Sequence, residues 1–89
     1  MYSKSTTIIN RTGLHARPAS DFIAAAGEFS SDIWIQKPEG QKLNAKSIVM
    51  LLFGGFKQGD TAIISAEGED EQASVDALIA LIDSGLNDL

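Results

Sequence analysis

The sequence contains no cysteine and only one histidine, His15. Without thiols the chain forms neither disulfide bonds nor thiolate metal centres, and their absence suits a reducing compartment such as the cytoplasm. One imidazole is also too few for a metal site built on several histidines. We therefore expect a cytoplasmic protein that carries no metal and no cofactor.

Basic residues and long apolar runs are scarce as well. The 7 Lys and Arg residues are outnumbered by 12 Asp and Glu, so the net charge is −5 and the basic face typical of nucleic-acid binding is missing. No apolar run approaches the ~20 residues of a membrane-spanning helix, and the first residues lack a signal-peptide pattern. The remaining composition, 44% hydrophobic and 21% charged, is typical of a globular protein. These features predict one soluble, monomeric domain over residues 1–89 that binds neither nucleic acid nor membranes.

The periodicity of the apolar residues predicts the secondary structure. Alternating patterns between turn signals indicate strands at residues 2–9, 32–36, 41–43 and 61–67. Apolar residues three and four positions apart indicate helices from about Ala16 to near Gly27, at 47–53 and at 69–84. Four short strands with helices stacked on one face form a two-layer α+β sandwich in the order β-α-β-β-α-β-α.

Residues 13–20, Gly-Leu-His-Ala-Arg-Pro-Ala-Ser, contain the chemistry of the chain. Proline is tolerated only in the first turn of a helix, so Pro18 indicates that the helix opens at about Ala16, directly after His15. The backbone N–H groups of Ala16 and Arg17 then lack helical partners and suit an anion. The positive end of the helix disfavours a charged imidazolium and so favours the neutral, nucleophilic form of His15. Arg17 adds a guanidinium that binds phosphate oxygens in bidentate fashion.

Two cationic side chains at the positive end of a helix are unfavourable unless an anion is expected there. The pattern therefore favours a phosphate site in which His15 is the nucleophile, although a merely exposed or structural histidine stays open. Ser20 lies too deep in the helix to be activated by His15, and the chain has no second base. Asp21 follows Arg17 by four residues on the same helical face, where we expect it to compete with phosphate for the guanidinium.

The predicted short helix has six apolar residues in succession: Ile48, Val49, Met50, Leu51, Leu52 and Phe53. A helix that lies on a sheet buries only one side, so some of these residues must face water, and exposed apolar patches usually bind a partner. The alternative is a helix buried all round, for which so short a chain has little room. Ser47 precedes the run as an N-cap or first-turn residue.

Residues 13–20 resemble the active-site motif of HPr, the histidine phosphocarrier family of the bacterial phosphoenolpyruvate:sugar phosphotransferase system. Residues 44–48, Asn-Ala-Lys-Ser-Ile, resemble the segment that carries the regulatory serine of the family, and residues 64–71 resemble its last strand and helix start. The length and the order of elements agree along the whole chain. The resemblance implies an open-faced sandwich with a four-stranded antiparallel sheet and three helices on one face.

The same resemblance implies a function. His15 would be phosphorylated on Nδ1 by phosphorylated Enzyme I and would donate to Enzyme II A domains, so the chain would be a phosphocarrier and no enzyme. Thr12 and Arg17 would be accessory phosphate-site residues, and Ser47 a regulatory phosphorylation site. The residues from Ile48 to Phe53 would help to dock Enzyme I and the A domains.

The pathway stays open. The turn at residues 37–40 is one residue longer than in many sugar-system members, and with residues 81–86 it also resembles the nitrogen-related paralogue. A regulatory HPr-like protein is a second class; it would act through Ser47, a serine kinase/phosphorylase and a catabolite-control transcription factor. The intact His15 argues against that class. A third class is a small α+β interaction module in which His15 is incidental.

Overall fold

The computed structural model describes residues 1–86 of the chain. Its strands are β1 (Tyr2–Thr7), β2 (Asp32–Gln36), β3 (Leu43–Asn44) and β4 (Thr61–Glu67). Its helices are α1 (Ala16–Ala26), α2 (Ile48–Phe53) and α3 (Glu71–Asp83). The predicted order β-α-β-β-α-β-α is therefore confirmed.

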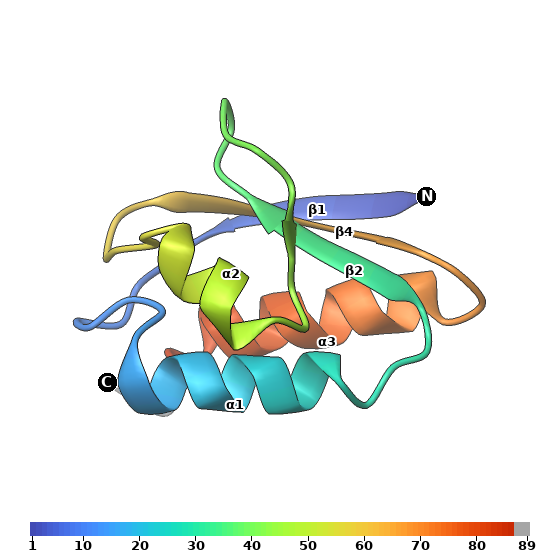
Figure 1. The fold of residues 1–89 in the computed structure, drawn as a ribbon, viewed down its shortest axis with the longest axis horizontal. Coiled ribbons are helices and arrows are strands. Elements are labelled where there is room, and N and C mark those ends of the chain that lie inside the picture. Colours follow the sequence, from blue (N-terminus) through green and yellow to red (C-terminus); the bar gives the residue numbers. More distant parts are fainter. Residues whose placement is uncertain (87–89) are drawn as a thin grey trace.

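The strands form one antiparallel sheet in the order β1-β4-β2-β3. The central strand β4 pairs with β1 from Tyr2–Ala66 to Thr7–Thr61 and with β2 from Asp32–Glu67 to Gln36–Ile63. The helices α1, α2 and α3 all lie on one side of the sheet (Figure 1). Its opposite face is not covered by any helix of residues 1–86, which confirms the predicted open-faced sandwich.

The core lies between the sheet and the helices. Every second side chain of β2 and β4 is buried there, and so is one stripe of each long helix. The buried apolar residues of these two strands are Ile33, Ile35, Ala62, Ile64 and Ala66. The buried stripes are Ala19, Phe22 and Ala26 in α1, and Val75, Leu78 and Ile82 in α3.

Two predicted strands differ in extent because partners distant in sequence decide where the ladder runs. Strand β1 stops at Thr7 rather than residue 9, since the backbone of Ile8 exchanges hydrogen bonds with Asp60 and Gly59 in the turn before β4. Strand β3 is shifted to Leu43–Asn44, the two residues that pair with Ile35 and Trp34.

Helix α3 begins later than predicted, at Glu71, because Asp70 is its N-cap. The Asp70 carboxylate does not cap its own helix. It accepts hydrogen bonds from the backbone N–H groups of Ser30 (2.9 Å) and Ser31 (2.9 Å) and from the Ser31 hydroxyl. These bonds tie the start of α3 to the loop between α1 and β2. No helix within residues 1–86 is long and apolar enough to cross a membrane.

Candidate functional site

His15 lies at the N-cap of α1, where the loop from β1 enters the helix. Its backbone is extended (φ −132°, ψ 161°), its side chain is exposed, and the imidazole forms no capping hydrogen bond. Most N-cap side chains accept a hydrogen bond from the first turn. The imidazole of His15 is instead left at the surface, where an incoming group can reach it.

The start of α1 is irregular at Ala16, whose φ of 49° places it in the left-handed region. That conformation costs roughly 1–2 kcal/mol for an L-residue and is common at functional sites. Pro18 lies in the first turn of α1, the position that its missing N–H predicts, and it is buried there. Within residues 1–86, the backbone N–H groups of Ala16 and Arg17 donate to no acceptor. The predicted unpaired donors beside His15 are therefore present.

The loop that leads to His15 packs on the segment between α2 and β4. The N–H of Leu14 donates to the carbonyl oxygen of Phe56 (3.0 Å), and both side chains are buried. Gly13 has φ 65°, and a Cβ atom on it would lie 2.3 Å from that same oxygen. Only glycine combines this backbone conformation with so close an approach.

Asn10 braces the loop from inside. Its buried amide Nδ2 donates to the carbonyl of Gly13 (2.8 Å) and lies 3.5 Å from Thr12 Oγ1. The N–H of Gly13 donates in return to the carbonyl of Asn10 (3.2 Å). Sequence reasoning missed Asn10 and Phe56. The available signal for Asn10 was its place in a turn, where asparagine side chains bind nearby backbone, whereas Phe56 had none.

Arg17 is exposed and forms no ion pair with any carboxylate of residues 1–86. Asp21 forms no ion pair with this guanidinium within residues 1–86, and its competition with phosphate stays a prediction. Thr12 is exposed in the same loop, two residues before Leu14. His15 and Arg17 are thus both exposed at the start of α1, and Thr12 is exposed in the loop that leads to them.

Helix α2 exposes much of its apolar run, as predicted. Val49 is 71% and Phe53 75% exposed, and Ile48 and Leu52 are also exposed. Leu51 is wrong as a surface residue, because it is fully buried in the core, and Met50 is half-buried. We call Ile48, Val49, Leu52 and Phe53 the α2 patch. Ser47 caps the helix, its Oγ accepting from the N–H of Met50 (3.3 Å).

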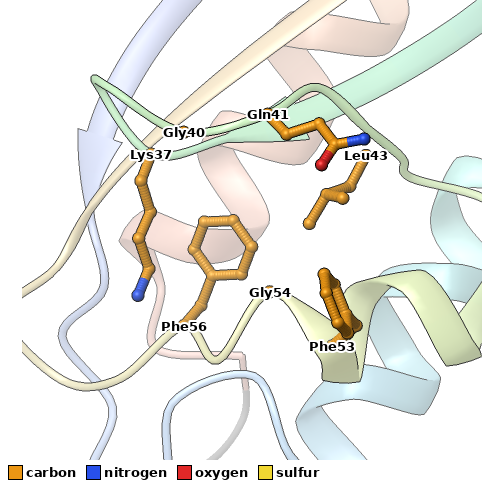
Figure 2. A pocket seen from close by; sticks show the side chains of 7 residues that line it. All are labelled: Lys37, Gly40, Gln41, Leu43, Phe53, Gly54 and Phe56. Atoms are coloured by element: carbon orange, nitrogen blue, oxygen red, sulfur yellow. The ribbon is translucent and has the colours of Figure 1, made fainter.

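A hollow of about 260 Å³ lies at the C-terminal end of α2, between the rings of Phe53 and Phe56 (Figure 2). Gly54 forms its floor, and a Cβ atom there would lie 2.5 Å from the Phe56 ring. None of its lining residues belongs to the loop that bears His15. Residues 1–86 contain no group of three or more His, Cys, Asp or Glu that could hold a metal ion.

Residues 2–84 match the family model described as "PTS HPr component phosphorylation site". The chain belongs to the HPr family. It is 46% identical over 82 residues to the phosphocarrier protein HPr of Haemophilus influenzae, covering 92% of this chain and 95% of that one. It is 43% identical over 83 residues to the HPr-like protein Crh of Halalkalibacterium halodurans, covering 93% and 98%.

The HPr fold is shared with solved structures. The crystal structure of HPr-C-His from Thermoanaerobacter tengcongensis is 44% identical and superposes with a TM-score of 0.95, covering 100% of this chain and 99% of that one. The chain is accordingly an HPr-family phosphocarrier of the phosphotransferase system. Relatives in this family are named HPr, Crh and NPr.

Proposed function

We propose that His15 accepts a phosphoryl group from phosphorylated Enzyme I and passes it to Enzyme II A domains of the sugar phosphotransferase system. One observation carries this proposal: an exposed imidazole stands at the start of α1 beside two backbone N–H groups without acceptors in residues 1–86. A phosphoryl group on the ring would find those donors in place.

The transfer step is a displacement at phosphorus. The lone pair of Nδ1 of neutral His15 attacks the phosphorus atom, and the bond from phosphorus to the donor breaks with its electron pair leaving on the donor. The N–H groups of Ala16 and Arg17 and the Arg17 guanidinium stabilise the negative charge on the phosphoryl oxygens during transfer. Thr12 adds a hydroxyl from the same loop.

We propose that the α2 patch is the docking surface for Enzyme I and the A domains. Its four side chains are apolar and exposed although the rest of the helix packs on the core. Surfaces of this kind usually mark a binding site. The patch follows Ser47, so phosphorylation of that hydroxyl would place about two negative charges at the edge of the docking surface.

A second candidate is a regulatory role, with a serine kinase/phosphorylase and a catabolite-control transcription factor as partners, or a role in the nitrogen-related branch. The similarity to a Crh protein (43% identity) and to an NPr protein supports this second candidate. The exposed His15 and the two N–H groups beside it favour a phosphocarrier over a protein that regulates through Ser47 alone, because regulation through Ser47 needs no nucleophile. We expect the working form to be a monomer. Solved relatives include dimers of Crh and of HPr. Sedimentation of the purified chain therefore tests the expectation.

The test is direct phosphorylation. The chain is incubated with phosphoenolpyruvate and Enzyme I, and intact-mass spectrometry is used to look for an adduct of about 80 Da that acid removes. We expect the adduct in the wild type and none in His15→Ala, whose melting temperature should stay close to the wild-type value because the side chain is exposed. Acid-labile labelling of His15→Ala would place the acceptor elsewhere and refute the assignment.

A further inference from the structure

The loop that ends at His15 rests on the segment of residues 54–60, which we call the platform. Backbone and side-chain hydrogen bonds join the two along their length. They are Leu14 N to Phe56 O (3.0 Å), Ile8 N to Asp60 O (2.9 Å), Gly59 N to Ile8 O (2.8 Å) and Gln58 Nε2 to Ile9 O (3.0 Å). Any shift of the platform is therefore transmitted to the backbone directly before His15.

Lys37 holds the platform from its other side. Its ammonium Nζ lies 3.3 Å from Asp60 Oδ2 and donates to the carbonyl of Gly55 (3.1 Å). The Lys37 ammonium thus joins Gly55, near the start of the platform, to Asp60 at its end. The same Asp60 oxygen accepts from the N–H of Lys57 (2.9 Å), so the carboxylate links Lys37 to the middle of the turn as well.

The surroundings of Lys37 strengthen this contact. Its side chain runs beside the Phe56 ring at the edge of the hollow (Figure 2), with Nζ 5.6 Å from the ring centroid. The side chains of Lys37 and Asp60 are only 38% and 32% exposed, so water screens the pair less than a surface ion pair. The backbone N–H of Lys57 and then the Lys37 ammonium hold the pKa of Asp60 below its usual value, which keeps the carboxylate ionised at neutral pH.

We propose that Lys37 is a positioning residue for phosphoryl transfer: it fixes the platform, and the platform fixes Leu14 and the imidazole that follows it. This inference rests on the proposed function of His15. Lys37 itself lies among the residues lining the hollow, and within residues 1–86 it forms no hydrogen bond or ion pair with the His15 loop. Its effect on His15 is transmitted through Phe56 and Leu14.

The proposal has a competitor within the same structure. Phe56 and Leu14 are both buried, and their packing could hold the platform without any help from Lys37. The two explanations differ in what happens when the ammonium is removed and the aliphatic stem is kept. Lys37→Met makes that change, and Lys37→Arg restores a cation that reaches Asp60.

The experiment compares Lys37→Met, Lys37→Arg and Lys42→Met. Lys42 is a matched control, because it belongs to the same connection between β2 and β3 but lies over the Trp34 ring, away from the platform. Amide hydrogen exchange of Leu14 and Gly59 is measured without any phosphoryl donor, with the amides of β4 as internal reference. The kcat and KM for phosphorylation by Enzyme I are measured on the same variants.

We expect Lys37→Met to speed exchange at Leu14 and Gly59 about tenfold while the β4 amides keep their wild-type rates. We expect kcat to fall about three- to tenfold with KM unchanged, because a misplaced acceptor slows transfer without weakening docking. Lys37→Arg should restore both readouts, and Lys42→Met should match the wild type.

Wild-type exchange at Leu14 and Gly59 in Lys37→Met would overturn the proposal in favour of apolar packing. Acceleration of all amides, including those of β4, would also overturn it, since Lys37 would then contribute only to global stability. A rise in KM alone would mean that its charge serves docking. If the wild type is not phosphorylated at all, the proposed function fails, whereas the exchange data still decide whether Lys37 holds the loop.

Discussion

The carbonyl oxygen of Phe56 lies 2.3 Å from the position that a Cβ atom on Gly13 would occupy. The two residues are far apart in sequence. The same oxygen accepts a hydrogen bond from the N–H of Leu14, the residue after Gly13. The approach of the two backbones therefore sets where the His15 loop leaves β1 and enters α1.

We predict that Gly13→Ala lowers the free energy of unfolding by about 2–4 kcal/mol, because its left-handed φ and the clash with Phe56 add up. Urea denaturation measures the change. Gly27→Ala is the matched control: φ there is −67° and the nearest atom lies 3.4 Å from the new Cβ, so stability should hold or rise slightly. Equal stability of Gly13→Ala and wild type would show that the two backbones are free to separate.

Arg17→Ala should slow phosphoryl transfer about 10–100-fold, the range expected from ~1.5–3 kcal/mol for a charge-assisted hydrogen bond. The melting temperature should change little, because the side chain is exposed and has no ion pair within residues 1–86. Stopped-flow transfer from phosphorylated Enzyme I measures the rate. Arg17→Lys, which keeps the charge but loses the planar fork, should be intermediate. A wild-type rate in both directions for Arg17→Ala would remove it from the site.

Ser47→Asp should leave the melting temperature unchanged or slightly raised while weakening phosphorylation of His15 at low Enzyme I concentration. The new carboxylate can still accept the N–H of Met50, and it lies at the positive end of α2. The new charge instead weakens the complex with Enzyme I, because the α2 patch would dock beside it. Gln72→Glu adds the same charge in α3 and should not slow the reaction. If Ser47→Asp is labelled as fast as wild type, Ser47 is a helix cap only.

Asp70 predicts how stability depends on pH. The Ser31 hydroxyl and the Ser30 and Ser31 N–H groups lower the pKa of Asp70 from 3.8 to about 2 in the folded protein. Because the pKa of Asp70 is lower in the folded than in the unfolded chain, its carboxylate contributes fully to the free energy of unfolding above pH ~4. This contribution is lost as the pH falls towards 2.

We therefore expect Asp70→Asn to be less stable than wild type at neutral pH, and the difference to shrink between about pH 4 and pH 2. Thermal melts followed by circular dichroism across that range provide the measurement. Glu28→Gln serves as control, because the Glu28 carboxylate has no hydrogen bond or ion pair within residues 1–86. A constant difference between Asp70→Asn and wild type at all pH values would contradict this assignment.

Local patterns determined much of the fold. Strands β2 and β4 have the predicted bounds, Asp32–Gln36 and Thr61–Glu67, because alternation of side chains and the turns that bound it are properties of short stretches. Pro18 located the start of α1 for the same reason, since the missing N–H acts within a single turn. The six-residue apolar run likewise predicted that α2 would expose apolar side chains, four of which do face water.

The tertiary structure alone decided which residues hold the candidate site in place. Phe56 and Lys37 carry no local sign of a contact with this region, and the ladder of β3 depends on where β2 lies. It also decided that Leu51, in the middle of the apolar run, belongs to the core. The chemistry of a side chain and the period of a helix are contained in a few neighbouring residues. The close approach of Phe56 to Gly13 requires that β1 and β4 pair, because this pairing brings the turn before β4 against the loop after β1.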